Sequence, residues 1–262
     1  TCIREKNTAG RKSDRAREAD MIRARLPKGG KITVFGDSVP KGLYLDGGKV
    51  ARVQKSAVRL ISEATGTEIE NFSAFGQTLN KCMEKGHVDR WIQEASKGDI
   101  LVFSLGGNDC DYDWAEVAAD PLAPHAPKTP YAEFVRLLGS AASKLKRAGF
   151  TPVFTSLAPI DSARYFKNVI CNKADGEQVM RFFRGDVTNI SRHQECYNDA
   201  VCKAALACGG IFLDFRSPLL LLPDYLGCLS DDGIHPNQRG HEEIASALLR
   251  SFPLLRAASP AG

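Results

Sequence analysis

Residues 99–104 read Asp-Ile-Leu-Val-Phe-Ser, and the chain continues Leu-Gly-Gly-Asn-Asp to residue 109. A short, continuous apolar run of this kind is typical of a parallel strand that is buried on both faces. The glycine-rich segment after it would then form a loop at the carboxyl end of the strand. These residues therefore predict the central strand of an α/β fold, with polar side chains at its end.

Similar strand-like runs alternate with helical patterns along the rest of the chain. We expect further strands at about 31–36, 67–72, 151–155 and 210–214. Apolar spacing predicts helices at about 50–64, 77–96, 130–148, 192–208 and from Pro236 to about Phe252. This alternation indicates βαβ units. We therefore predict a three-layer α/β/α sandwich of the flavodoxin-like type, with five parallel strands in the order 2-1-3-4-5.

Composition divides the 262 residues into three parts. Residues 1–30 carry nine Lys or Arg and four Asp or Glu, a local charge of +5, so the rest of the chain sums to −1. We expect 1–30 to form a basic helical extension, because its charges alternate in sign and no aromatic residue is present to stack on bases. A polyanion-binding arm is the alternative. We predict one domain over residues 31–252 and a frayed tail over residues 253–262. Because the domain is nearly neutral, we expect it to have no nucleic-acid partner.

Length and hydropathy indicate one domain with a complete core. No apolar stretch approaches eighteen residues, so we expect no membrane span. No signal peptide is visible and we expect a cytoplasmic protein, although a chain that begins at Thr1 leaves a removed leader open. The eight cysteines contain no Cys-x-x-Cys pair, and we expect them to be reduced and buried, with disulfides as the alternative. The oligomeric state is left open.

Two separate motifs supply the groups of a serine hydrolase. Residues 34–38 read Val-Phe-Gly-Asp-Ser, which places Ser38 at the end of the first strand. Far along the chain, Asp232 and His235 stand three residues apart at the expected start of the last helix. A serine, a histidine and a carboxylate can act as nucleophile, base and orienting group. Loops at the carboxyl ends of parallel strands converge, so we expect the three side chains to meet.

Two more loops complete a recognisable set. Residues 71–76 read Asn-Phe-Ser-Ala-Phe-Gly, and the loop after the central strand contains Gly107-Asn108-Asp109. With the motifs at Ser38 and at Asp232 and His235, this ordered set resembles the SGNH, or GDSL-type, hydrolase family over residues 32–240. The resemblance implies that Ser38 is the nucleophile and that Asp232 and His235 complete the triad. It also implies oxyanion donors at the Ser38 N–H, the Gly76 N–H and the Asn108 side chain. Asp231 competes as partner of His235, but the family's spacing selects Asp232.

Substrate contacts are expected on two variable stretches, the acidic loop 109–116 and the long connection 159–190. Our candidate contacts are Asp37, Tyr112, Trp114 and Arg164. The two aromatic rings can stack on a sugar face or pack their loop onto the body of the protein, and the sequence leaves both readings open.

The family resemblance implies a serine esterase that hydrolyses carboxylic esters through an acyl-serine intermediate. We expect a small-molecule ester with a short acyl group on a polar or carbohydrate-like alcohol, and no cofactor. The alternatives are a thioesterase or lysophospholipase of the same family and a non-catalytic, flavodoxin-like ligand-binding module. We expect no metal site, because Trp114 stands where a calcium loop beginning at Asp109 requires glycine. His241 is expected to be exposed or partly buried.

Overall fold

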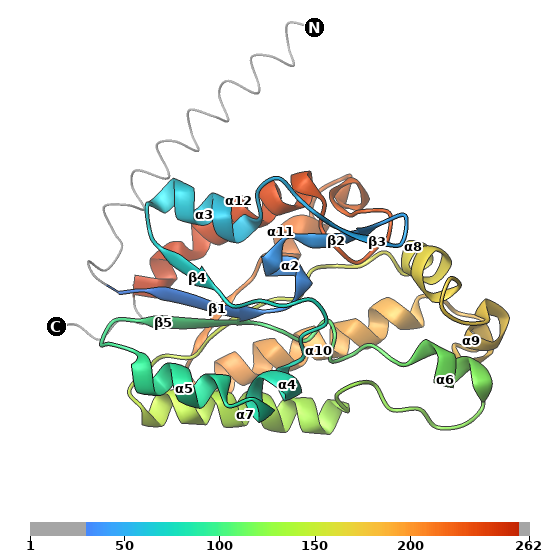
Figure 1. Cartoon of the computed structure of the whole chain (residues 1–262), viewed down its shortest axis with the longest axis horizontal. Helices are drawn as coiled ribbons and strands as arrows, with labels where there is room; N and C mark the ends of the chain where they lie inside the picture. Colours follow the sequence, from blue (N-terminus) through green and yellow to red (C-terminus); the bar gives the residue numbers. More distant parts are fainter. Residues whose placement is uncertain (1–29, 257–262) are drawn as a thin grey trace, which may run out of the picture.

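A five-stranded parallel sheet forms the centre of the fold (Figure 1). The computed structural model describes residues 30–256. Across the sheet the strands are β4 (Ile69–Asn71), β1 (Ile32–Gly36), β5 (Ile100–Ser104), β6 (Val153–Thr155) and β7 (Ile211–Leu213). Numbered among themselves, these five strands have the predicted order 2-1-3-4-5. The labels differ from that order because a separate hairpin, which we did not predict, interrupts the chain between β1 and β4.

Helices cover both faces of the sheet, as predicted (Figure 1). One face carries α3 (Ala57–Thr65), α11 (Arg216–Leu220) and α12 (Gln238–Arg256). The other carries α4 (Leu79–Glu84), α5 (His87–Glu94), α7 (Tyr131–Arg147) and α10 (Asn189–Ala207). The architecture is therefore a three-layer α/β/α sandwich.

The central strand β5 shows why the apolar run had to be continuous. Ile100 and Val102 belong to the apolar cluster beneath α3 and α12, whereas Leu101 and Phe103 belong to the cluster beneath α7 and α10. Successive side chains of a strand point to opposite faces, so a strand covered on both sides needs apolar residues at every position.

The predicted helix at 50–64 is wrong in its first part. The chain forms an antiparallel hairpin of β2 (Leu43–Asp46) and β3 (Lys49–Arg52), and α3 begins only at Ala57. Gly47 and Gly48 both have positive φ, 54° and 79°, as a two-residue hairpin turn requires. This turn chemistry outweighs the helical spacing of the valines in the segment.

Two other helices differ from their predicted limits. The predicted helix at 77–96 is split into α4 and α5 at Gly86, whose φ is 64°. The last helix begins at Gln238 because Pro236 pairs with Leu229 in an isolated β-bridge. It extends to Arg256, so the first part of the predicted tail is helical. The rest of the tail and residues 1–29 of the predicted basic extension lie outside the described residues.

Short helices gather beside the carboxyl ends of the strands. They are α2 (Ser38–Lys41), α6 (Trp114–Ala119), α8 (Ser162–Tyr165), a π-helix (Phe166–Ile170), α9 (Gly176–Phe182) and a 3₁₀ turn (Tyr225–Cys228). Of these, α6, α8, the π-helix and α9 pack around a third apolar cluster that includes Trp114, Tyr165 and Phe183. In Figure 1 α6, α8 and α9 form the right-hand end of the molecule.

Two expectations about single residue types need correction. His241 is fully buried, and its Nδ1 accepts a hydrogen bond of 3.2 Å from the Ala57 N–H. Burial lowers the pKa of His241 to about 4. Cys171 and Cys196 are exposed rather than buried, although all cysteines within residues 30–256 are free.

Within residues 30–256, no helix is both long enough and apolar enough to cross a membrane.

The packed layer between the sheet and α7 predicts a large loss of stability for Leu138→Ala. Leu138 is 1% exposed, and truncating such a side chain costs about 2–5 kcal/mol of unfolding free energy. Leu221→Ala, at a position that is 82% exposed, is the matched control and should change it by less than about 0.5 kcal/mol. Urea unfolding measures both. Equal effects of the two substitutions would contradict the assigned core.

Candidate active site

Ser38 begins the short helix α2 directly after β1. The Asp37 side chain caps this helix, since its Oδ1 accepts a hydrogen bond of 2.9 Å from the Val39 N–H. Gly36 allows the turn, because a Cβ there would lie 2.3 Å from Pro40 Cγ and 2.7 Å from Ser73 Oγ. The strand end and the cap therefore fix the Ser38 hydroxyl at the end of the sheet.

The structure brings the three predicted triad side chains into one hydrogen-bonded chain. Ser38 Oγ lies 2.8 Å from His235 Nε2, and His235 Nδ1 lies 2.7 Å from Asp232 Oδ2. All three residues are buried. With the Nδ1 proton held by the carboxylate, the neutral ring presents the Nε2 lone pair to the serine hydroxyl. Asp231, the competing candidate, is exposed and lies outside this chain.

The Asp232 carboxylate is unusually well supplied with donors. Oδ1 accepts from the Ser230 hydroxyl at 2.7 Å and from the Ile234 and His235 N–H groups at 2.9 Å each. Oδ2 accepts from the Leu45 N–H at 2.8 Å as well as from the His235 ring. Burial alone would raise the pKa of Asp232, but hydrogen bonds and charge from His235 and nearby N–H groups outweigh it and lower that pKa to about 2. The carboxylate is therefore ionised throughout the neutral range.

Asp232 and His235 lie in a closed turn before α12. The sequence analysis had placed them at the start of that helix, which is wrong. The Ser230 N–H donates to the His235 carbonyl at 2.8 Å, and the Gly233 N–H donates to the Ser230 carbonyl at 3.0 Å. Gly233 has a φ of 75°, a conformation that favours glycine. The turn brings the carboxylate back onto its own His235 backbone N–H and ring.

The loops that carry the predicted oxyanion donors are joined to each other. Asp109, next to Asn108, is fully buried, and both its carboxylate oxygens accept from the Leu79 N–H at 3.0 Å. Leu79 follows Gly76 by three residues, and Phe75 stacks on the His235 ring with centroids 6.4 Å apart. Burial raises the pKa of Asp109. The contacts place both loops beside the triad.

The two oxyanion candidates themselves differ in their surroundings. Asn108 is half-buried and lines the pocket next to Ser38. At Gly76, with a φ of 69°, an added Cβ would meet no atom within 4 Å. Glycine is therefore favoured there by the backbone conformation and not by a close approach of other atoms.

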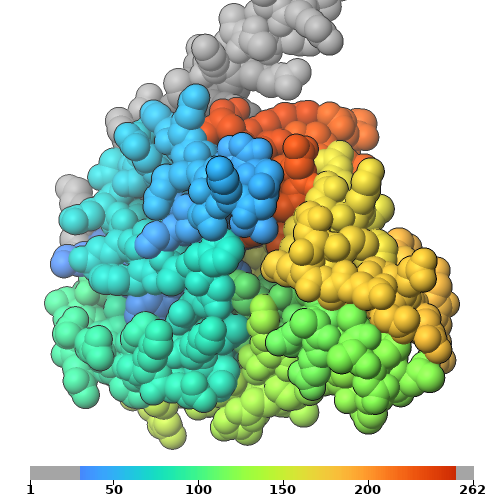
Figure 2. All heavy atoms as spheres, turned by 45° about the vertical axis from the view of Figure 1, so that its right-hand side comes forward, coloured from blue at the N-terminus to red at the C-terminus, as the bar shows by residue number. Residues whose placement is uncertain are grey.

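A pocket of about 110 Å³ opens beside Ser38 and His235. Figure 2 shows the surface hollowed where the blue and teal segments meet the yellow and green ones. Of our four candidate substrate contacts, three line this pocket: Asp37, Tyr112 and Trp114. The sequence analysis did not single out His193 and Tyr165, which also line it.

The aromatic pocket wall is held by a partly buried carboxylate. Asp111 Oδ1 accepts from Trp114 Nε1 at 3.0 Å and from the Tyr165 hydroxyl at 2.8 Å, while Oδ2 pairs with Lys128 at 2.6 Å. The Tyr112 ring packs against Trp114 at a centroid distance of 5.4 Å. The rings therefore pack the loop to the body, which confirms the second reading. They also line the pocket, and stacking on a sugar face stays a prediction.

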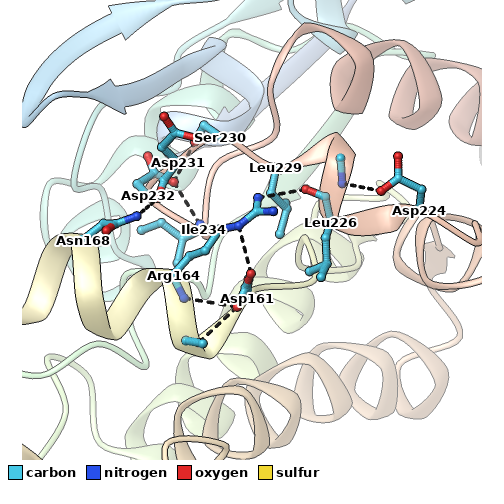
Figure 3. A network of polar contacts seen from close by, with 12 residues as sticks. Asp161, Arg164, Asn168, Asp224, Leu226, Leu229, Ser230, Asp231, Asp232 and Ile234 are labelled. Carbon is cyan, nitrogen blue, oxygen red and sulfur yellow. Dashed lines mark hydrogen bonds and ion pairs between the residues drawn. The ribbon is translucent and has the colours of Figure 1, made fainter.

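Arg164 does not line the pocket. Its side chain belongs instead to a network of polar contacts with Asp161 and Leu226 (Figure 3). Its Nε pairs with Asp161 Oδ2 at 3.1 Å, and its Nη1 donates to the Leu226 carbonyl at 3.0 Å. The guanidinium thus binds neighbouring segments of the protein, although the sequence analysis predicted that it contacts the substrate.

The three aspartates that resemble a calcium loop have protein partners instead. Asp109 and Asp111 accept the bonds just described, and Asp113 Oδ1 caps α6 through the Ala115 and Glu116 N–H groups at 3.1 and 3.2 Å. Within residues 30–256, no group of three or more His, Cys, Asp or Glu side chains is arranged to hold a metal ion.

Comparisons with known proteins indicate one family and a shared fold. Residues 34–243 match the model of the GDSL-like lipase/acylhydrolase family. Similar solved structures include a lipase/acylhydrolase from Enterococcus faecalis (TM-score 0.58, 17% identity, covering 86% of this chain and 95% of that one). Another is an acetylxylan esterase from Geobacillus stearothermophilus (TM-score 0.59, 18% identity, covering 87% and 96%). No curated protein matches the chain.

Asp37 gives this site a cost in stability that depends on pH. Burial raises the pKa of Asp37 to about 6, against opposing effects of the Val39 N–H and the charge of His235. Because the folded-state pKa lies above the ordinary value of 3.8, the contribution of Asp37 to stability is present below about pH 4 and is lost as pH rises through 6. Asp37→Asn keeps an oxygen for the cap but removes the titrating group. The free energy of unfolding of the variant, relative to that of the parent, should therefore rise by roughly 1–3 kcal/mol between pH 4 and pH 7.

Urea unfolding at the two pH values measures this difference. Asp46→Asn, at an exposed position, is the control and should show no such change. A difference between Asp37→Asn and the parent that stays constant with pH would contradict the assignment.

Proposed function

Since the chain belongs to the GDSL-like lipase/acylhydrolase family and is a carboxylic ester hydrolase, we propose that Ser38, His235 and Asp232 are its catalytic triad. The observation that carries the proposal is the unbroken chain of short hydrogen bonds from Ser38 Oγ through the imidazole to Asp232. A non-catalytic, flavodoxin-like module would have no use for this chain of buried polar groups.

In the proposed reaction, Ser38 Oγ attacks the ester carbonyl while His235 Nε2 takes its proton. His235 then donates this proton to the leaving alcohol, and an acyl-serine remains. Water, activated in turn by His235, releases the acid and restores Ser38. Asp232 orients the imidazole and stabilises its cationic form. The Ser38 and Gly76 N–H groups and the Asn108 amide would stabilise the oxyanion, whose charge exists only in the transition state and the tetrahedral intermediates.

We propose a short acyl group on a polar, carbohydrate-like alcohol as the substrate. The pocket of about 110 Å³ is well below the roughly 300–1,000 Å³ of sites for drug-sized ligands, which favours an acetyl over a long acyl chain. The half-exposed ring of Phe75, stacked on His235, offers a flat face for a sugar ring at the mouth of the site. The acetylxylan esterase named above acts on such an ester and is consistent with this choice. A thioesterase or lysophospholipase would need room for a longer chain.

The pocket size predicts a steep dependence on acyl length. The kcat/KM for p-nitrophenyl esters should be highest for the acetate and at least roughly 10-fold lower for the octanoate, because the longer acyl chain does not fit in the pocket. Acetylated xylose should also be hydrolysed. Ser38→Ala is the control, with an expected loss of turnover on the order of 10⁶. A preference for octanoate or for acyl thioesters would favour the alternative activities instead.

The oxyanion role predicts a specific kinetic effect of Asn108→Ala. Its kcat should fall by about 10²–10³ with a smaller change in KM, because the lost hydrogen bond forms mainly in the transition state. Steady-state kinetics on p-nitrophenyl acetate separate the two constants. If KM rose while kcat held, Asn108 would bind the ground-state substrate and the proposed role would be wrong.

A further inference from the structure

Besides the hairpin, the loop that carries Asp232 and His235 rests against residues 161–168 (Figure 3). The Asn168 side chain donates to the Asp231 carbonyl at 2.6 Å. The Asp161 N–H donates to the Gly233 carbonyl at 2.7 Å. The same segment therefore holds a backbone carbonyl on each side of Asp232.

The contact between loop and segment is close as well as polar. A Cβ added at Gly233 would lie 2.7 Å from both Arg164 Cβ and Asp161 O, and 2.8 Å from the Tyr165 N. Arg164 extends the contact by binding the Leu226 carbonyl, and Figure 3 shows its side chain between Asp161 and Leu226. The loop thus has little room to shift toward this side.

The segment is itself anchored to the protein body. Tyr165, Val169 and Ile170 are buried in the apolar cluster around Trp114. The Tyr165 hydroxyl donates to Asp111 in the pocket wall. Residues 166–170 form a π-helix, an irregularity that is frequent at functional sites. Support of this kind can keep a catalytic loop within the narrow range of positions that reaction needs.

We propose that Asn168 is a positioning residue, which holds the Asp232–His235 turn in its reactive alignment with Ser38. This inference rests on the triad proposed above. Asn168 does not line the pocket, and its side chain donates to the Asp231 carbonyl, so we infer that it acts through the peptide between Asp231 and Asp232. Its loss should slow the chemical step and leave binding of the ester unchanged.

The test compares Asn168→Ala with Asn172→Ala. Both asparagines are exposed, and each donates one side-chain hydrogen bond to a backbone carbonyl, but Asn172 binds the Asn168 carbonyl and not the catalytic turn. With p-nitrophenyl acetate, Asn168→Ala should lower kcat about 10-fold per folded molecule, with KM within twofold of the parent. Asn172→Ala should keep both constants within twofold. Asn168→Asp, which keeps the shape but loses the donor, should resemble Asn168→Ala.

The controls separate this inference from the proposed triad. Thermal unfolding gives the folded fraction of each variant, so a loss of folded protein is not counted as a loss of rate. If the parent is active, Ser38→Ala is inactive and both asparagine variants have the parent's kcat, the positioning role is wrong while the triad stands. A rise in KM without a fall in kcat would also overturn it. If Ser38→Ala stays active, the triad itself is wrong and the positioning role falls with it.

Discussion

The buried carboxylate of Asp232 is the group on which the site depends. A charge taken out of water is costly unless hydrogen bonds replace its solvation. Here the donors come from its own turn, from the His235 ring and from the hairpin β2–β3 through Leu45. Removing one donor would leave part of a buried charge unpaired. The positions of the turn, the hairpin and the imidazole therefore depend on one another.

The same principle joins the rest of the site to the sheet. Asp109 lies buried between the loops after β4 and β5, and Asp37 caps α2 after β1. Each carboxylate fixes a loop that the parallel sheet delivers to one edge. Asp37 has a cost, because burial raises its pKa to about 6 and the carboxylate is destabilising when ionised. Such a loss of folding stability is common where a functional site must hold polar groups out of water.

Much of this was predictable from the sequence, and the failures have physical reasons. The five strands and their alternation with helices followed from apolar periodicity, whereas the pairing of Asp232 with His235 followed from the resemblance to the hydrolase family. The hairpin at 43–52 was missed because Val50 stands at helical spacing from Val53 and Val58, which obscured the Gly47-Gly48 turn. The donor from Leu45 is a backbone N–H, which no residue type reveals. Arg164 was assigned to the substrate because sequence does not show which face of a short helix meets the pocket; Tyr165 meets it instead.

The central claim is that Ser38 is an activated nucleophile, and labelling with a fluorophosphonate tests it most directly. The probe phosphonylates a serine hydroxyl with loss of fluoride, and peptide mass spectrometry locates the adduct. The account predicts one adduct per molecule, on Ser38, formed rapidly in the parent and nearly abolished in His235→Ala. An unlabelled parent under conditions that label trypsin completely, or an adduct on another residue with Ser38 unmodified, would contradict it.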